Sequence, residues 1–372
     1  MHDSFWHGKK VLLTGHTGFK GSWLVLWLQR LGAQVIGLAL PPASRPNLFE
    51  AAGVGREMTS LIGDITDLSL LRSIVNEHRP QIVIHMAAQP LVRLSYADPV
   101  GTFATNVMGT VHMLEAVRHC PGVRVVVIVT TDKCYQNREW IWGYRENEAL
   151  GGHDPYSASK ACAEIVTAAY RDSFFKAAST TAVATVRAGN VIGGGDWSPD
   201  RLVPDVLAAF AEGRPAILRN PTAIRPWQHV LEPLGGYLLL AQKLWENGSE
   251  LAGAYNFGPS DADALPVVQV VERLADLWGN GASWEQDADA HPHEAHLLRL
   301  DCSKSRARLG YTPRLTLQEA LMWIVDWHRQ WLTGGDVRKA TEAQIEQFVR
   351  LRQTTPPDIA SRPNSLPRRR GR

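Results

Sequence analysis

The chain has 372 residues, of which 45% are hydrophobic and 20% are charged, and its formal net charge is +2. A chain of this length and composition can bury a full core, in one large domain or two smaller ones. A charge balance this close to neutral argues against a polyanion-binding surface, so we expect no nucleic-acid partner.

The start of the chain and its cysteines argue against export. The segment MHDSFWHGKK has no apolar signal-peptide core, and no stretch approaches 18 apolar residues. The four cysteines, Cys120, Cys134, Cys162 and Cys302, lie far apart and form no C-x-x-C pair, as is typical of reduced thiols in the cytosol. We therefore predict a cytoplasmic protein that does not insert into a membrane.

Short apolar runs alternate with longer amphipathic stretches through the first half of the chain. The runs span residues 10–15, 34–40, 58–64, 81–88, 123–131 and 180–190. This alternation predicts an α/β fold, a doubly wound parallel sheet of the Rossmann type with helices on both faces. Because the runs are continuously apolar, we expect the strands to be buried on both sides.

A glycine-rich turn follows the first run and precedes an apolar helix. Gly15, Gly18 and Gly21 would let a pyrophosphate approach backbone N–H groups, and the helix N-terminus adds partial positive charge. The G-x-x-G-x-x-G spacing is one residue off the usual dinucleotide pattern, and a purely structural turn is the alternative. The acidic residue expected about 20 positions later is missing, because the next run ends in Ala39 and Leu40. The residues alone therefore leave NAD and NADP open.

Two further strand ends carry candidate cofactor contacts. In GDITD, Asp64 could reach the adenine edge, or Asp64 or Thr66 could cap the next helix, and the sequence leaves both open. Ala87 and Ala88 end the fourth run, where small side chains would let a flat cofactor approach. Tight packing of a helix on the sheet is the alternative for these two alanines.

The segment DPYSASKACAE carries a Tyr and a Lys four residues apart. Tyr156 and Lys160 therefore lie on one face of a helix. A cation in that place is expected to lower the pKa of the phenol, so that Tyr156 can take a hydroxyl proton while hydride leaves the same carbon. The pattern is common by chance, but it becomes specific behind a glycine-rich nucleotide loop.

With these residues in place, the chain resembles the extended short-chain dehydrogenase/reductases, and within them the CDP-glucose 4,6-dehydratases. The resemblance covers roughly residues 5 to 330, through blocks such as GHTGFKGSWL, TTDKCYQN, YSASK, RAGNVIGGGDW and RPWQHVLEPLGGYL. It implies an NAD-dependent hydro-lyase of deoxysugar biosynthesis. Such an enzyme oxidises C4 of CDP-glucose, eliminates water across C5 and C6, and returns the hydride to C6. The resemblance also implies a homodimer or homotetramer.

The stretch TTDKCYQN follows the fifth run and holds the residues for elimination. By the resemblance, Thr131 would bind the C4 oxygen beside Tyr156, Asp132 would protonate the leaving C6 hydroxyl, and Lys133 would stand where most relatives have a glutamate base. A lysine would need its pKa of about 10.4 lowered by about 3 units to be neutral at pH 7, so Lys133 could instead stay charged and stabilise an enolate.

Geometry limits how this stretch can act. Neighbours on a strand point to opposite faces, so Thr131, Asp132 and Lys133 can converge only if the chain leaves the strand there. A surface ion pair between Asp132 and Lys133 is the alternative.

The resemblance assigns further residues to the cofactor and to the substrate. The cofactor residues are Gly15, Thr17, Gly18, Phe19, Lys20, Gly21, Asp64, Ile65, Ala87, Ala88, Gln89, Asn106, Tyr156 and Lys160. The substrate residues are Gln89, Arg93, Asn190, Arg201 and Arg225. The histidine-rich stretch HPHEAH fits no zinc spacing well, so we expect no metal.

Domain organisation follows from the same patterns. Residues 1–190 are predicted to form an NAD-binding Rossmann-type domain with the catalytic Tyr and Lys, and residues 191–350 mainly a nucleotide-sugar-binding lobe, some of whose segments return to the sheet. Residues 355–372 are predicted to be a disordered basic tail.

Two other functions share many of these features. A nucleotide-sugar 4-epimerase would use the same loop, Tyr and Lys, but it needs no acid–base pair at C6, so the Thr-Asp-Lys triplet argues against it. A catalytically silent NAD-sensing protein would be free to lose Tyr156 or Asp132, and this chain retains both.

Overall fold

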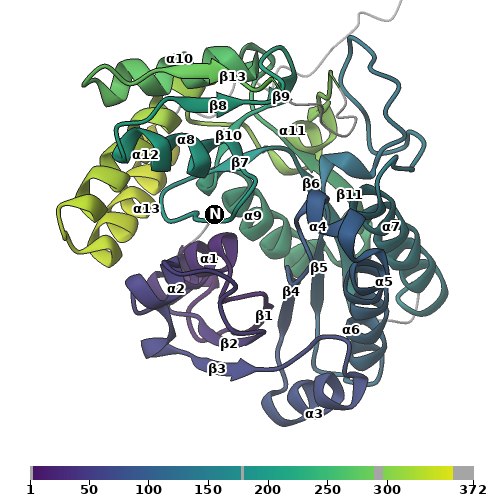
Figure 1. Cartoon of the computed structure of the whole chain (residues 1–372). Helices are drawn as coiled ribbons and strands as arrows, with labels where there is room; N and C mark the ends of the chain where they lie inside the picture. Colours follow the sequence, from purple (N-terminus) through teal and green to yellow (C-terminus); the bar gives the residue numbers. More distant parts are fainter. Residues whose placement is uncertain (1–2, 177–179, 289–295, 355–372) are drawn as a thin grey trace, which may run out of the picture.

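A seven-stranded parallel sheet forms the centre of the structure, a computed structural model that describes residues 3–176, 180–288 and 296–354. The strands lie in the order β11-β6-β5-β4-β1-β2-β3 (Figure 1). The predicted tail, residues 355–372, and most of the histidine-rich stretch, residues 291–295, lie outside the described residues.

Six of the strands form in the six apolar runs. They are β1 (Lys10–Thr14), β2 (Gln34–Ala39), β3 (Thr59–Ile62), β4 (Ile82–His85), β5 (Val125–Val129) and β6 (Ala182–Ala188). The order 3-2-1-4-5-6 is that of dinucleotide-binding sheets, so the predicted doubly wound fold is confirmed. β11 (Gly253–Phe257) adds a seventh strand beside β6. The expectation of burial on both sides is wrong for β3, whose residues are largely exposed because it is an edge strand.

Helices cover both faces of the sheet (Figure 1). On one face lie α3 (Leu68–His78), α6 (Gly109–Arg118) and α7 (Pro155–Phe174), whose apolar side chains join a cluster with alternate strand residues. On the other face lie α1 (Phe19–Arg30) and α9 (Leu231–Asn247). Successive strand residues point to opposite clusters, as β geometry requires.

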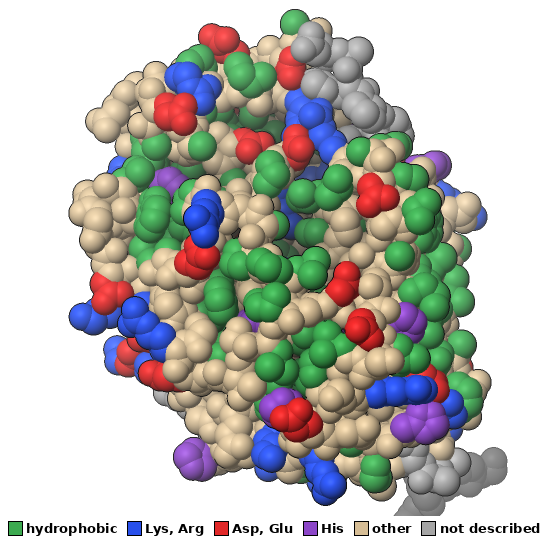
Figure 2. Space-filling view, turned by 60° about the horizontal axis from the view of Figure 1, so that its bottom comes forward, with side chains coloured by type: hydrophobic (Ala, Val, Ile, Leu, Met, Phe, Trp, Pro, Cys, Tyr) green, Lys and Arg blue, Asp and Glu red, His purple; other side chains and the backbone are tan. Residues whose placement is uncertain are grey.

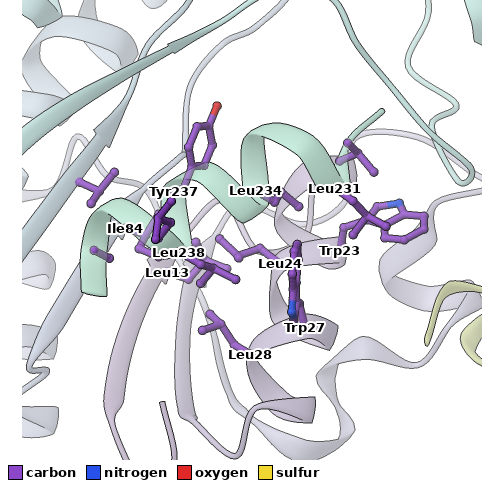
Figure 3. Close-up of a cluster of buried hydrophobic side chains, with 14 of the residues drawn as sticks. Leu13, Trp23, Leu24, Trp27, Leu28, Ile84, Leu231, Leu234, Tyr237 and Leu238 are labelled. Carbon is purple, nitrogen blue, oxygen red and sulfur yellow. The ribbon is translucent and has the colours of Figure 1, made fainter. Parts of the chain in front are cut away.

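The packing of α1 against α9 fixes the helix that follows the glycine-rich turn. Trp23 and Trp27 of α1 and Leu234 and Tyr237 of α9 are fully buried members of one apolar cluster (Figure 3). Burying one such side chain stabilises the fold by about 1.5–3 kcal/mol, so this cluster holds the N-terminus of α1 firmly. The hydroxyl of Tyr237 points away from the cluster (Figure 3).

A smaller group of elements follows β6 and packs above the sheet. α8 (Leu202–Ala211), α10 (Val267–Trp278) and α12 (Leu317–Leu332) share a third apolar cluster. α13 (Val337–Thr354) packs on α12 and on α1. The short strands pair as β7 (Val191–Ile192) with β10 (Gln228–His229), β9 (Ile224–Pro226) with β12 (Ala264–Pro266), and β8 (Ala216–Leu218) with β13 (Trp284–Gln286). The predicted division of the chain at residue 190 stays a prediction.

The remaining helices are short. They are α2 (Leu48–Ala51), α4 (Val92–Ala97), α5 (Pro99–Phe103) and α11 (Ser303–Leu309). In the ranges that the structure covers, no helix is long and apolar enough to cross a membrane. On the face that Figure 2 shows, acidic and basic side chains are interspersed with hydrophobic ones, in keeping with the near-neutral charge.

Candidate active site

A cavity of about 820 Å³ opens at the carboxyl ends of the sheet strands. Its walls are built from the residues that directly follow β1, β2, β3, β4, β5 and β6, and from α8, β8 and β9 of the smaller group. The strand order reverses between β1 and β4, and open parallel sheets bind ligands at such a point. The residues that the sequence predicted for the site are therefore expected to line this cavity.

The glycine-rich turn lines this cavity and is too tight for side chains. Gly15 has a φ of +79°, and a Cβ there would lie 2.9 Å from the backbone N of Ala87. A Cβ at Gly21 would overlap the carbonyl oxygen of Gly15. Gly18 is the N-cap of α1 and makes no side-chain cap, so none covers the first turn of the helix. These features fit a dinucleotide pyrophosphate, which needs close backbone approach and a helix N-terminus.

Three other residues of the turn also line the cavity, and Lys20 points toward its catalytic end. Thr17 donates a hydrogen bond to the carbonyl of Leu40 at 2.8 Å, and Phe19 begins α1. Nζ of Lys20 donates to the hydroxyl of Tyr237 at 3.1 Å. Burial lowers the pKa of Lys20 to about 7, helped by the charges of Arg201 and Lys160 and opposed by Asp132.

The structure settles how the helix after GDITD is capped. Asp67 is the N-cap of α3, and its carboxylate accepts a hydrogen bond from the backbone N of Leu70 at 3.0 Å. The expectation that Asp64 or Thr66 caps this helix is wrong. Asp64 instead accepts from the backbone N of Thr66 in a local turn, and it lines the cavity together with Ile65.

The loop after β4 holds residues that line the cavity and residues that do not. Ala87 and Ala88 line the cavity, whereas Gln89 and Asn106 are not among its lining residues. The side chain of Asn106 is bonded to both backbone groups of Gln89 and to the hydroxyl of Ser159 on α7. The Gln89 side chain bonds to Leu91 and Thr102. Both therefore hold the loop behind the cavity wall.

The predicted departure from the strand at Thr131 is confirmed. β5 ends at Val129, and a 3-10 turn begins at Asp132 with Thr131 as its N-cap. The Thr131 hydroxyl accepts a hydrogen bond from the backbone N of Lys133 at 3.3 Å and donates one to Oδ1 of Asp132 at 3.0 Å. All three side chains line the cavity.

Asp132 is 2% exposed, which rules out the alternative of a surface ion pair. Its Oδ2 has no hydrogen-bond partner among the residues that the structure describes. Burial raises the pKa of this carboxyl, against the charges of Lys133 and Arg225 and the hydrogen bond from Thr131. A carboxyl with a raised pKa is suited to donate a proton.

Tyr156 and Lys160 lie on the first turns of α7, which Asp154 caps. Nζ of Lys160 donates to the carbonyl of Val129 at 3.1 Å, and burial lowers the pKa of Lys160 to about 8. Burial also raises the pKa of Tyr156 to about 12, opposed by a hydrogen bond with Thr131 and the charge of Arg201. The expectation of a lowered phenol pKa is therefore wrong for the protein alone, because desolvation outweighs the hydrogen bond with Thr131 and the charge of Arg201.

The substrate-side cations converge on the same cavity from several elements. Arg93 of α4 pairs with Asp200 at 3.3 Å, and Arg201, the N-cap of α8, pairs with Asp196 at 3.1 Å. Arg225 of β9 is buried and donates to the carbonyl of Ile224 at 2.9 Å. Asn190, directly after β6, also lines the cavity. This arrangement suits an anionic ligand such as a diphosphate.

Two residues near the site were missed by sequence reasoning. Glu164 is buried one turn beyond Lys160. Its position eight residues after Tyr156, on the same helix face, could have indicated from the sequence that it lies near the site. Tyr237 carries no such signal, because it stands within an apolar helix and resembles any core aromatic residue. Among the described residues, no group of three metal-ligating side chains forms a metal site.

Comparison with known proteins places the chain in a family. Residues 12–322 match the family model described as GDP-mannose 4,6 dehydratase. The chain is 53% identical over 353 residues to the CDP-glucose 4,6-dehydratase of Salmonella typhimurium. This match covers 94% of this chain and 98% of that relative. These matches confirm the resemblance that the sequence motifs indicated.

Solved structures agree with this placement. The dTDP-glucose 4,6-dehydratase of Streptomyces venezuelae, solved with NAD and TYD bound, has a TM-score of 0.75 at 26% identity, over 88% of this chain and 99% of that one. The UDP-glucose 4-epimerase of Thermus thermophilus, solved with NAD, has a TM-score of 0.73 at 27% identity, over 86% and 99% of the two chains. Because a family model spans most of its length and a relative is 53% identical over 94% of it, this chain belongs to the nucleotide-sugar 4,6-dehydratases described by the GDP-mannose 4,6 dehydratase model.

Proposed function

We propose that this chain is an NAD-dependent hydro-lyase that converts CDP-D-glucose to CDP-4-dehydro-6-deoxy-D-glucose. The observation that carries the proposal is that Asp132 and Lys133 share one cavity with Tyr156 and Lys160. Oxidation at C4 alone would need only the latter two. A buried carboxyl beside them supplies the acid that elimination at C6 requires. The name of the 53% identical relative supports CDP-glucose as the substrate.

The residues that would hold the cofactor are those of the glycine-rich turn, with Asp64 and Ile65 on the adenosine side and Ala87, Ala88 and Lys160 further along the cavity. When bound, NAD supplies a hydride acceptor for C4 of the sugar and a hydride donor for C6. The relatives solved with NAD support this cofactor. Arg45, on the loop after β2, is the cation that a 2′-phosphate of NADP would need. It is exposed, and its Nε lies 3.9 Å from Oε2 of Glu50.

At C4, Tyr156 takes the hydroxyl proton and Thr131 holds the same oxygen. The hydrogen bond between Thr131 and Tyr156 brings the two hydroxyls to one point of the cavity. Because the pKa of Tyr156 is about 12 in the protein alone, the tyrosine needs positive charge beside it to act as a base near neutral pH. Arg201 provides such charge in this structure, and we assign the same role to Lys160, which lies one turn along α7 and lines the same cavity.

At C5 and C6, Asp132 protonates the departing hydroxyl and Lys133 acts on the C5 proton. Oδ2 of Asp132 is buried and has no hydrogen-bond partner within the described chain, so it is the oxygen that we assign to the proton transfer. Once C4 is a ketone, the C5 proton is acidic, and its loss creates negative charge on the C4 oxygen. Lys133 either removes that proton as a neutral amine, or stabilises the enolate as a cation while water takes the proton. Thr131 and Tyr156 are the hydroxyl groups beside the C4 oxygen that can donate to it.

At the nucleotide end, Arg93, Asn190, Arg201 and Arg225 hold the diphosphate and the nucleoside. Their guanidinium groups suit bidentate contacts with phosphate oxygens. Two of these guanidinium groups also form ion pairs within the chain, Arg93 with Asp200 and Arg201 with Asp196. Gln89 contributes indirectly, by shaping the loop before Arg93.

The finer assignments of assembly and location also belong to this proposal. Val100 and Phe103 of α5 and Ile165 of α7 expose 78%, 36% and 57% of their surface, and α5 packs on α7. A homodimer through these two helices would cover them, and two such dimers could form a tetramer. All four cysteines are free, which supports a reducing compartment such as the cytoplasm.

Mass spectrometry of products tests the activity. The purified protein is incubated with NAD and, separately, with CDP-, dTDP-, UDP- and GDP-glucose, and the Tyr156→Phe variant is the control. Loss of one water from CDP-glucose alone, with no accumulation of NADH, is the expected result. No loss of water from any of them by protein shown to bind NAD would reject the proposal. A C4 epimer has the same mass as its substrate, so proton NMR of the products detects it, and its formation would establish the 4-epimerase alternative.

A further inference from the structure

Glu164 is a buried carboxylate with three donors and no place in the mechanism above. It lies on α7, one turn beyond Lys160 and two turns beyond Tyr156, and 3% of its side chain is exposed. The carboxylate accepts from the Thr130 hydroxyl at 2.5 Å, the Thr185 hydroxyl at 2.7 Å and the Arg187 guanidinium at 2.7 Å. Burying a carboxylate is costly unless its charge is paired and its oxygens are hydrogen-bonded. The three donors meet this requirement and fix the orientation of the carboxylate.

The three donors come from the strand ends that carry the site. Thr130 directly precedes Thr131 and also donates to the carbonyl of Val186, so it joins β5 to β6. Thr185 and Arg187 belong to β6, whose end lines the cavity. Glu164 therefore ties the helix that carries Tyr156 and Lys160 to the strands next to the Thr-Asp-Lys triplet.

Glu164 is also the anion that acts on Lys160. The pKa of Lys160 is about 8, where burial lowers it and Glu164 is the largest opposing influence. Other titratable groups facing Lys160 are Tyr156 on its own helix, Cys134 from the 3-10 turn, His85 from β4 and Lys20 from α1.

Those other groups supply no negative charge at neutral pH. Burial raises the pKa of Cys134 and lowers that of His85 to about 3, so both are neutral. Arg187 of β6 faces Glu164, and Glu115 of α6 meets α7 only at Tyr170, beyond the site. Within the described chain, the charge that keeps Lys160 a cation comes from Glu164.

We propose that Glu164 is a positioning residue that keeps Lys160 charged and locks α7 to the strand end that bears Thr131 and Asp132. The proposal rests on the proposed function, because Glu164 would act through Lys160 and Tyr156. It assigns Glu164 no contact with substrate or cofactor.

The direct test is an NMR titration of Lys160 in the protein without ligands. The protein is labelled with 13C-lysine, and the Lys160 signal is assigned by its loss in Lys160→Arg. In Glu164→Gln, which keeps the shape and removes the charge, the Lys160 titration midpoint is expected to fall by about one pH unit. Thr185→Val is the matched control, because it deletes a hydrogen bond to Glu164 and keeps the charge.

Two results would overturn the inference. One is a Lys160 midpoint that does not move in Glu164→Gln, and the other is an equal fall in Thr185→Val. Glu164→Gln leaves Arg187 buried without its anion and could fail to fold. In that case Glu164→Gln combined with Arg187→Met carries the measurement, because Arg187 is not among the groups that set the pKa of Lys160.

A second readout separates this inference from the proposed function. If wild type dehydrates CDP-glucose, loss of charge on Lys160 raises the pKa of Tyr156, so the acidic limb of kcat moves to higher pH in Glu164→Gln and stays in place in Thr185→Val. An active wild type with an unmoved limb in Glu164→Gln rejects the role of Glu164. A wild type inactive on every nucleotide glucose rejects the proposed function, while the NMR result on Lys160 still stands or falls by itself.

Discussion

Oδ1 of Asp132 accepts the Thr131 hydroxyl at 3.0 Å, while Oδ2 of the same carboxyl has no partner among the described residues. A Cβ at Gly189 would lie 2.8 Å from that buried Oδ2, so glycine leaves room beside this oxygen. Thr131 thus fixes Oδ1 of Asp132, and Oδ2 is the oxygen that we assign to the proton transfer at C6. Asp132 therefore acts at C6, whereas Thr131 binds the C4 oxygen.

Asp132→Asn is expected to stop the reaction after C4 oxidation. The amide keeps the size of the carboxyl and can still bond to Thr131, but it cannot donate a proton to a leaving hydroxyl. Loss of a general acid typically slows a step by about 10²- to 10⁴-fold. Single-turnover absorbance at 340 nm should show NADH forming and persisting, and mass spectrometry should show little loss of water. An equal loss of NADH formation and of dehydration would remove Asp132 from the C6 role.

Tyr156→Phe is expected to abolish the earlier step, C4 oxidation. Phenylalanine cannot take the C4 hydroxyl proton, so NADH should not form, with a loss of about 10²- to 10⁴-fold. Tyr170→Phe is the matched control, since Tyr170 lies on the same helix and bonds to Glu115 away from the cavity. The measurement is single-turnover NADH formation with CDP-glucose. Retained C4 oxidation in Tyr156→Phe would move the base to another residue.

Lys133 can be a base or a cation, and two substitutions distinguish these roles. Lys133→Met removes both properties, so exchange of the C5 proton with deuterated solvent should slow by about 10²-fold or more. Lys133→Arg keeps the positive charge but cannot act as a base, because arginine stays protonated. Exchange restored by Lys133→Arg indicates electrostatic stabilisation, whereas exchange lost in both indicates a base. NMR of the C5 position gives the rate, and unchanged exchange in Lys133→Met assigns the base elsewhere.

The framework of the site could be read from the sequence because it depends on local patterns. Six continuous apolar runs predicted the strands, and parallel strands bring their carboxyl ends to one edge. Gly15 and Thr131 lie far apart in the chain, yet each stands at the end of a predicted strand, so the sequence alone could place them at the same edge of the sheet. The expectation that segments after residue 190 return to the sheet did not single out β11, because GAYNF is short and stands in an irregular region.

Orientation and electrostatics could not be read in the same way. Asn106 and Gln89 are polar residues near the cofactor loop, and only the packing shows that they bond to each other behind its wall. The pKa of Tyr156 depends on burial by segments far apart in the chain, and the effect of burial exceeds those of Thr131 and Arg201. Asp67 caps α3 instead of Asp64, because the helix begins one residue after Asp67.

Gly15→Ala is expected to weaken NAD binding by about tenfold or more. A methyl group there would lie 2.9 Å from the backbone N of Ala87, and a φ of +79° is unfavourable for alanine. The turn must shift, and the N–H groups that approach a pyrophosphate shift with it. Gly122→Ala is the control, because its Cβ would meet nothing within 4 Å and its φ is ordinary. Calorimetric titration with NAD measures both, and equal affinity in the two variants would contradict the assignment of the turn.

His229 is expected to make the protein less stable in acid. It is fully buried between Trp23 and Trp323, away from the cavity, and burial lowers its pKa to about 3. The unfolded chain, with a histidine pKa of about 6.5, binds more protons between the two values, so stability falls as the pH drops below about 6.5.

The size of this effect gives the test. One such histidine contributes a slope of about 1.4 kcal/mol per pH unit between pH 6 and pH 4. His229→Asn keeps an acceptor for the backbone N of Leu231 and removes the titrating ring. Its free energy of unfolding is measured in urea at pH 8, 6, 5 and 4. At pH 8 it should be lower than that of wild type, because the smaller side chain leaves a void in the core, and it should then fall less steeply as the pH drops. Parallel curves for the two proteins would show that His229 is not the source of the acid sensitivity.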